Sequence, residues 1–209
     1  MRLSLFALLL NMVVALPVFA GQSAAEAPPL REFPKVDDQN PLSPKEQQSP
    51  VGALDDLFAQ LHTQTDDVAG RRVAQQIWAI WNKSASATTN LMMGWAGEAM
   101  AQDRFALAED LLTQVIVLEP GYAEGWNRRA TLYFGMGDIG ASVSDIERTL
   151  QLEPRHFGAL SGLGIILEKT GQDHKALEIW NKVLSIYPAN AQAQRSVIEL
   201  EEKLAGQGT

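Results

Sequence analysis

The stretch VLEPGYAEGW, residues 117–126, places a proline and a glycine between two runs that are typical of helix. A similar arrangement returns 34 residues later as QLEPRHFGAL (151–160), and after a further 34 the proline recurs in SIYPANAQAQ (185–194). Because proline does not continue a helix, the three stretches mark equivalent helix boundaries. A constant spacing of this length predicts a chain built from stacked helical repeats.

Three units of this length, 89–122, 123–156 and 157–190, can be compared position by position. The eighth position is small in every unit: Ala96, Ala130 and Gly164. The twentieth position is also small, and four residues later each unit has a bulky side chain: Leu112, Ile146 and Trp180. Small residues let two helix backbones approach each other, and bulky ones fill the space beside them. Each unit is therefore predicted to be a packed pair of helices.

Turn residues separate the two helices of each unit. The second and third units contain Gly137-Asp138 and Gly171-Gln172-Asp173. Glycine suits the left-handed conformation that ends a helix, and an aspartate side chain can accept the first free amides of the next one. Asp103 offers the same acceptor in the first unit, so we expect aspartate caps in all three units.

These features resemble the tetratricopeptide (TPR) repeat family across residues 89–190, in period, in small-residue positions and in the closing proline. The resemblance implies an all-α fold, a right-handed superhelix of antiparallel helix pairs. The second unit departs from the family at Arg129, where leucine is usual, and at Thr149, where alanine is usual. Residues 51–88 fit the same register loosely and are interpreted as a degenerate N-terminal repeat, and 191–209 as a C-terminal capping helix and tail.

The N-terminus has the pattern of an export signal. Arg2 precedes an apolar run over residues 3–16, and a small-residue junction follows at Ala20. That run is shorter than the ~20 residues that span a bilayer, which favours a cleaved signal peptide over 1–20 rather than a membrane anchor. Six of the ten prolines lie within 21–50, which is typical of a disordered linker. We expect a periplasmic protein, cleaved after Ala20 and with no stable membrane anchor.

Composition excludes several classes of function. Cysteine is absent, which rules out disulfides and thiolate chemistry. The chain carries 17 Lys and Arg against 25 Asp and Glu, a formal net charge of −8, which argues against a nucleic-acid partner. The three histidines, His62, His156 and His174, lack metal-binding spacing and are interpreted as surface or turn residues. The glycine-rich stretch GALSGLG (158–164) lacks the residues of a phosphate loop or of a hydrolase nucleophile. No catalytic residue, metal or cofactor is predicted.

The family resemblance implies that the first helix of each unit lines a concave face. Ten residues at those positions are the candidate peptide-binding groove: Met93, Gly97, Met100, Asn127, Arg128, Thr131, Phe134, Ser161, Ile165 and Glu168. The alternative, that the apolar members belong to the core, stays open because helical spacing does not distinguish core from wall.

Some family members hold the terminal carboxylate of a peptide with lysine, arginine and asparagine side chains at these positions. Here Gly97, Gly158 and Gly162 stand where several of those donors are needed, and Asn127 and Arg128 alone are too few. The remaining wall of methionine, phenylalanine and isoleucine favours a peptide that presents apolar residues.

The sequence therefore predicts a non-enzymatic periplasmic scaffold that binds a protein or peptide, an envelope protein in particular. Small exported TPR proteins of Gram-negative bacteria, which this chain resembles, are in some cases linked to cell-envelope integrity and assembly. A cell-wall glycan binder that stacks sugars on exposed tryptophans is the alternative. Against it, Trp95, Trp126 and Trp180 recur near bulky core positions, where core packing is the expected role.

Overall fold

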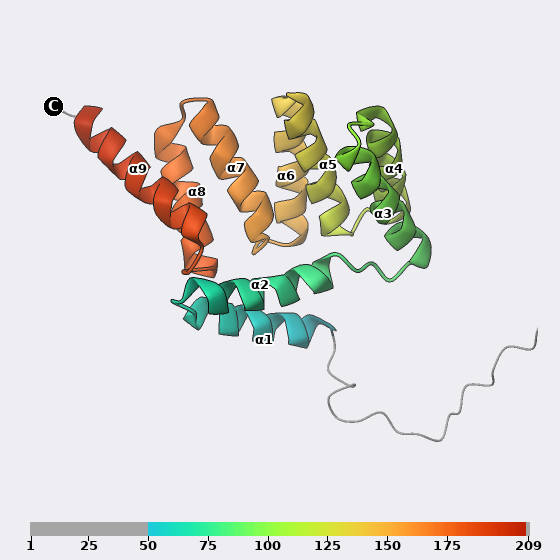
Figure 1. Ribbon diagram of the computed structural model, residues 1–209, viewed down its shortest axis with the longest axis horizontal. Helices are drawn as coiled ribbons and strands as arrows, with labels where there is room; N and C mark the ends of the chain where they lie inside the picture. The colour runs from blue at the N-terminus through green and yellow to red at the C-terminus, as the bar shows by residue number, and fades with distance from the viewer. Residues whose placement is uncertain (1–49, 208–209) are drawn as a thin grey trace, which may run out of the picture. The chain divides into compact units, whose positions relative to one another are not determined.

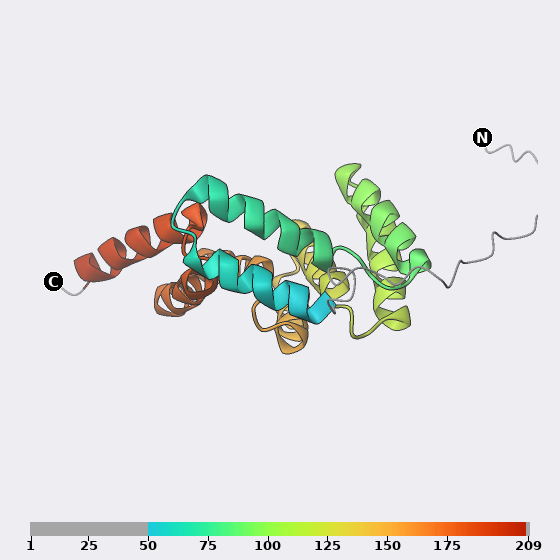
Figure 2. The same cartoon turned by 90° about the horizontal axis from the view of Figure 1, so that it is seen from below.

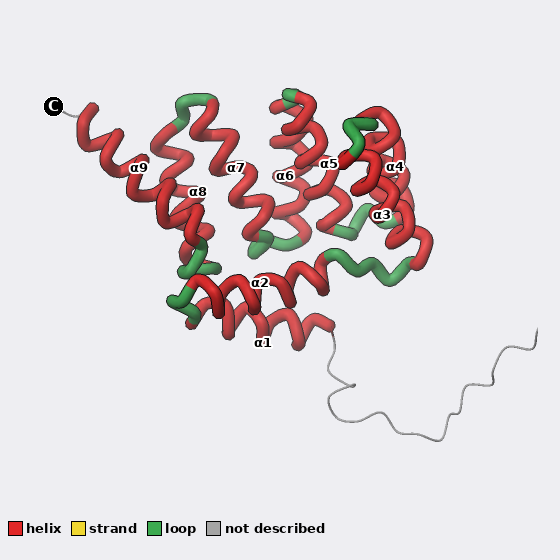
Figure 3. The backbone as a smooth tube through the Cα atoms, viewed as in Figure 1, coloured by secondary structure: helices red, strands yellow, loops and turns green. Residues whose placement is uncertain are grey.

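The computed structural model describes residues 50–207, and every regular element in that range is an α-helix (Figures 1 and 3). Nine helices follow one another through short turns: α1 (Pro50–Thr63), α2 (Asp67–Trp81), α3 (Ala87–Ala101), α4 (Phe105–Leu118), α5 (Ala123–Met136), α6 (Ile139–Leu152), α7 (Phe157–Lys169), α8 (Asp173–Ile186) and α9 (Ala191–Gln207). The all-α prediction is confirmed for this range. The predicted signal peptide and all of the predicted linker except Pro50 lie outside the described residues, as do residues 208–209.

Helices α3 to α9 pack in chain order, each against the next (Figure 1). The predicted small positions lie at the closest contacts, because Ala96, Ala108 and Ala176 are fully buried. At Gly164 a Cβ atom would lie 2.6 Å from Cε2 of Trp180, so no larger residue fits there without a shift of the ring. The repeat stack, as we call α3–α9, is therefore held by small residues facing bulky ones, as the sequence comparison predicts.

The turns inside the units differ from the prediction in one respect. Gly137 and Gly171 take the left-handed conformation, with φ of 82° and 72°. Asp138 caps α6 by accepting from the Ala141 amide at 3.0 Å. The prediction of aspartate caps is wrong for the other two units, because α4 and α8 begin after Arg104 and Gln172, which make no side-chain cap. Asp103 instead takes the left-handed position itself, with φ of 56°.

The helical hairpin α1–α2 does not lie alongside α3, where a stacked first repeat would put it. It crosses the ends of other helices, as Figures 1 and 2 show, and its apolar side chains share one core with Phe157, Tyr187 and Ala189. Asp55 pairs with Arg155 at 2.7 Å. The physical reason is aromatic: Trp78 and Trp81 of α2 both pack against the Phe157 ring, with centroids 5.6 Å and 5.0 Å apart.

The tryptophans divide between core and surface. Trp180 is fully buried, as expected, whereas the expectation of a core position is wrong for Trp95, which is 49% exposed because no helix of residues 50–207 packs over that face of α3. Trp126 is only half-buried, with its indole N–H donating to the Pro120 carbonyl at 3.0 Å. The interpretation of Trp126 as a core residue is therefore wrong: the hydrogen bond holds its ring at the margin of the stack, under the guanidinium of Arg129.

Candidate binding groove

A cavity of about 230 Å³ opens between α5, α6 and α7. Of the described residues that line it, none is charged, and most are apolar or carry a hydroxyl: Asn127, Ala130, Thr131, Phe134, Ser142, Ile146, Gly158, Ala159, Ser161, Gly162, Ile165 and Ile166. Gly162 supplies open space, since a Cβ atom there would meet only Cδ1 of Ile146 at 3.6 Å. A cavity of this size and lining suits one aliphatic side chain.

Two further cavities adjoin this one. One, of about 350 Å³, shares Asn127 and Thr131 with it and is otherwise lined by α3, α5 and Trp78. The other, of about 410 Å³, shares Gly158 and Ser161 with it and extends to the start of α9. The three cavities together are the groove: it follows the first helices of the units, α3, α5 and α7. Helix α2 lines one side of it with Asp67, Arg71, Ala74, Gln75 and Trp78.

The groove contains eight of the ten candidate residues: Gly97, Met100, Asn127, Arg128, Thr131, Phe134, Ser161 and Ile165. Met93 does not reach it. Its side chain is 3% exposed and packs in the core with Ala96 and Leu112, because Met93 lies on the face of α3 that packs against α4. Glu168 is also absent from the three cavities, since its carboxylate accepts the indole N–H of Trp180.

The structure also adds residues of α2 that the sequence comparison missed, Trp78 foremost among them. Trp78 lines two of the three cavities. Its distance of three positions from Trp81 indicates a shared helix face, but no local pattern shows that this face meets α7. Its position depends on where the hairpin packs.

Asn127 and Arg128, the two side chains that could donate hydrogen bonds to a ligand's carboxylate, already donate to a carboxylate of the protein. Glu124 is 3% exposed and accepts from Asn127 at 2.8 Å and from Arg128 at 3.2 Å. Arg128 also donates to Asn82 and to the Met93 carbonyl. Glu124 therefore takes the place that the terminal carboxylate of a ligand would need.

His156 completes this polar cluster and is fully buried, so the interpretation of it as a surface or turn residue is wrong as regards burial. Its Nδ1 accepts from the Ala159 amide at 3.1 Å and caps α7. Its Nε2 lies 3.3 Å from Glu124, outside hydrogen-bond geometry, and its ring stacks on Trp81 with centroids 4.1 Å apart. The imidazole therefore contacts three parts of the molecule: Glu124 at the groove, the first turn of α7, and Trp81 of the hairpin.

Tyr122 precedes α5 as its N-cap residue, near Glu124 of the same cluster. Burial, and next the charge of Glu124, raises the pKa of the Tyr122 hydroxyl to about 12. Among the described residues, that buried hydroxyl has no hydrogen-bond partner. The phenol therefore stays neutral beside Glu124 at physiological pH and contributes apolar contact.

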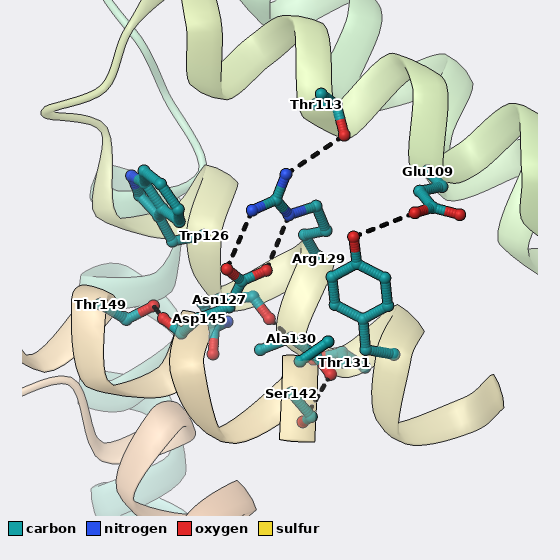
Figure 4. Close-up of polar contacts among 12 residues, drawn as sticks. Glu109, Thr113, Trp126, Asn127, Arg129, Ala130, Thr131, Ser142, Asp145 and Thr149 are labelled. Carbon is teal, nitrogen blue, oxygen red and sulfur yellow. Dashed lines mark hydrogen bonds and ion pairs between the residues drawn. The ribbon is translucent and has the colours of Figure 1, made fainter. Parts of the chain in front are cut away.

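Helix α5 is held in place by the residue that departs from the family pattern (Figure 4). Arg129 donates twice to Asp145, at 2.7 and 2.9 Å, and once to Thr113 at 3.2 Å. The hydrogen bond with Asp145 raises the pKa of the Arg129 guanidinium. Arg129 thus joins α4, α5 and α6 and fixes the helix that carries Asn127 and Thr131 to the groove.

No family model matches the chain. A TPR repeat-containing protein of Rhizobium etli is 50% identical over 161 residues, which cover 77% of this chain and 79% of that protein. The small glutamine-rich tetratricopeptide repeat-containing protein 2 of Saccharomyces cerevisiae is 31% identical over 94 residues, 45% of this chain and only 27% of the yeast protein.

Solved structures share the fold. The first TPR of Spaghetti (RPAP3), bound to an HSP90 peptide, has a TM-score of 0.55 at 20% identity and covers 58% of this chain and 99% of its own. The MamA protein has a TM-score of 0.51 at 20% identity, with coverage of 73% and 81%. At these identities the likeness shows the fold alone. Within residues 50–207, no helix combines the length and apolarity needed to cross a membrane.

Proposed function

Because the chain belongs to the tetratricopeptide (TPR) repeat family, we propose that it is a non-enzymatic scaffold that binds an extended segment of a protein partner in the groove. The observation that carries the proposal is the uncharged cavity of about 230 Å³ between α5 and α7. A cavity of this kind takes an apolar anchor, and the adjoining cavities accommodate the residues on either side of it.

The ligand that fits is an internal segment with an aliphatic side chain rather than a chain end. RPAP3 in the related structure holds an HSP90 peptide. In this chain Asn127 and Arg128 are engaged by Glu124, and releasing them would leave a buried charge unpaired. Affinity should therefore come from apolar burial and backbone contacts, with little dependence on a free carboxylate.

The proposed compartment is the periplasm, and the proposed partner class is an envelope protein. The support is the signal-peptide pattern over residues 1–20, with its small-residue junction before Gly21. N-terminal sequencing of the protein from a periplasmic fraction should begin at Gly21. An uncleaved chain retained with the cytoplasm would reject the compartment without touching the groove.

A photo-crosslinking amino acid at Phe134, which lines the cavity, tests the groove in intact cells. The companion variant is Gly162→Leu, which fills the cavity from open space on α7. We expect it to reduce crosslinking about tenfold or more, because the anchor loses its site. The matched control is Gly140→Leu on α6, a glycine outside the three cavities whose Cβ would meet only the Asp138 carboxylate at 3.7 Å. Equal crosslinking in all three proteins would reject the groove as the binding site.

A second candidate function, glycan binding, is favoured by one observation. Trp95 is 49% exposed and shares a surface pocket with Glu98, Gln102 and Arg104, an aromatic platform beside polar groups. Peptidoglycan fragments should then quench tryptophan fluorescence, and Trp95→Ala should abolish the quenching. Quenching that survives in Trp95→Ala would reject this pocket.

A further inference from the structure

We propose that the α1–α2 hairpin is a lid on the groove, and that the outer face of α3–α4 is its second docking place when the groove opens. The proposal rests on the proposed function for its purpose, since it describes regulation of the same groove. The hairpin movement itself can be measured without any ligand.

The closed position is the one that the structure contains. The Trp78 ring lies directly on the α7 backbone, since a Cβ atom at Gly158 would lie 2.6 Å from Cη2 of Trp78. Trp78 lines two of the three cavities, one on each side of the uncharged cavity. A segment that runs along the groove would therefore meet this side chain, and binding is easier once the hairpin has moved.

The second docking place is an apolar surface that the hairpin leaves bare. Of the eight exposed large hydrophobic side chains among the described residues, five are on α3 and α4: Leu91, Trp95, Leu107, Val117 and Leu118. Trp95 and Leu107 share a pocket of about 400 Å³. Elsewhere in the repeat stack, α4 packs against α5, α6 against α7, and α8 against the single helix α9. Exposed apolar patches of this kind mark a contact surface.

The hairpin suits this face in size, pattern and attachment. Its helices have 14 and 15 residues, and α3 and α4 have 15 and 14. Ala74 and Trp78 fall 34 residues before Ala108 and Leu112, at the small and bulky positions of a repeat. Residues 82–86 join α2 to α3, a connection only one residue longer than those between the stacked units. So short a tether gives the hairpin a high effective concentration at α3–α4.

The connection between α2 and α3 contains a candidate hinge at residues 82–83. Ser84 is fixed to the stack, because its amide donates to Asn90 at 2.8 Å and its hydroxyl donates to Glu119 at 2.6 Å. Asn82 is fixed to the hairpin by its bond to the Trp78 carbonyl and to the groove by Arg128. The exposed Lys83 lies between these two attachments. Opening therefore breaks the Arg128–Asn82 bond and rotates the chain about residues 82–83.

The closed contact also leaves polar atoms unsatisfied. Trp81 Nε1 and His156 Nε2 are buried where the hairpin meets α7: the first has no hydrogen-bond partner among the described residues, and the second has only the Glu124 carboxylate at 3.3 Å, outside hydrogen-bond geometry. Opening exposes both atoms to water and so offsets part of the apolar contact that is lost. The two positions can then be close enough in free energy for a ligand to shift the balance.

A single cysteine reports the lid position, because the chain has no native cysteine. Ser161→Cys lies in a groove cavity that Trp78 also lines, and we expect a bulky polyethylene-glycol maleimide to react with it faster after opening. We expect Trp78→Ala to accelerate this labelling about tenfold. Ala176→Cys, fully buried in the stack, is the control for unfolding, and its labelling should not change.

Trp95→Gln is the sharper variant, since Trp95 is exposed in the closed position and its loss does not threaten the fold. It removes apolar contact from the second docking place alone, so we expect it to slow labelling of Ser161→Cys about threefold. Ile198→Gln, an equally exposed residue on α9, should have no effect. Labelling that Trp95→Gln leaves unchanged would overturn the second docking place, and labelling insensitive to Trp78→Ala would overturn the lid.

The two proposals fail in different ways. If labelling of Ser161→Cys responds to Trp78→Ala but the crosslinker at Phe134 captures no partner, the peptide-binding function is rejected and the lid is retained. A Phe134 crosslink that Gly162→Leu abolishes, in a protein whose labelling does not respond to Trp78→Ala, would reject the lid and keep the function.

Discussion

At the scale of single residues, the same amino acid has different roles on one helix. Gly164 lies against the Trp180 indole and Gly162 faces the open groove cavity, although both belong to α7. Position 103 shows the converse case: an aspartate takes a left-handed conformation that the later units give to Gly137 and Gly171. In each case the surroundings decide what a substitution does.

The two glycines of α7 should respond to alanine with opposite signs. Gly162→Ala adds a methyl at ordinary van der Waals distance from Cδ1 of Ile146 and should raise the free energy of unfolding by about 0.5–1 kcal/mol, because alanine is the better helix former. Gly164→Ala forces the Trp180 ring to shift and should lower it by about 1–3 kcal/mol. Urea unfolding of both variants measures the difference. Changes of the same sign would contradict the distinction between groove and core glycines.

Asp103→Gly should stabilise the protein by about 1 kcal/mol, because glycine has no steric cost at a φ of 56°. The reciprocal variant Gly137→Asp should lose a similar amount. Thermal unfolding of the two proteins beside wild type tests this, and a stability loss in Asp103→Gly would mean that the carboxylate has a contact of its own.

Arg129 and Asp145 should behave as one unit. Their side chains are 16% and 5% exposed, so either Arg129→Leu or Asp145→Ala alone leaves a largely buried charge unpaired and should cost about 3–5 kcal/mol. The double variant should recover most of that loss, because leucine is the usual family residue and no charge remains. A double-mutant cycle by urea unfolding measures the coupling, and additive losses would refute it.

At the scale of helices, the units differ in how their second helix begins. Asp138 caps α6, whereas Gln172 precedes α8 without a side-chain cap, and Asp173 pairs with Lys203 of α9 instead. The first amides of α8 therefore lack the acceptor that α6 has. Substitutions can therefore remove the cap from α6 or supply one to α8.

Asp138→Ala should cost about 1 kcal/mol, the usual loss of an N-cap side chain. Gln172→Asp should add up to about 1 kcal/mol by supplying the missing acceptor to α8. Denaturant unfolding followed by circular dichroism measures the stability change of each variant from its midpoint. A midpoint for Gln172→Asp below that of wild type would indicate that the turn before α8 cannot take the capping geometry.

At the scale of the described unit as a whole, the hairpin links parts of the chain that a simple stack would leave independent. It touches the start of α7 through Phe157 and the turn between α8 and α9 through Tyr187 and Ala189. In an array where each repeat contacts only its neighbours, residues 50–81 would not sense these positions. Here they share one core, so their stabilities should be coupled.

Phe157→Ala should therefore lower stability by about 3–5 kcal/mol, because the ring is 4% exposed among Trp78, Trp81 and Tyr187. Native-state hydrogen exchange should show amides of α2 losing protection together with those at the start of α7. Leu112→Ala, buried in the separate core of α3 and α4, is the control and should leave α2 protected. Unchanged exchange in α2 of Phe157→Ala would contradict the coupling.

Most of the groove could be predicted from residue spacing, since Asn127, Thr131 and Phe134 recur on one face of a helix whose position the repeats define. Met93 could not be assigned correctly, because the same spacing also fits the α3–α4 core, and only the turn of the helix places it there. The hydrogen bonding of Arg128 could not be predicted from the sequence either, because its bond to Asn82 joins residues 46 positions apart.

The helix pairs of residues 89–190 follow from the amino-acid order, because small-to-bulky contacts and proline boundaries are local and repeat every 34 residues. The place of α1–α2 follows from tertiary contacts such as Asp55 with Arg155, 100 positions apart, and Trp78 with Phe157. A helix pair with an apolar face can bury it on any complementary surface, and burial is not directional. Periodicity therefore defines which helices form, and tertiary contacts decide that the first pair packs against the start of α7 and the α8–α9 turn and leaves α3–α4 bare.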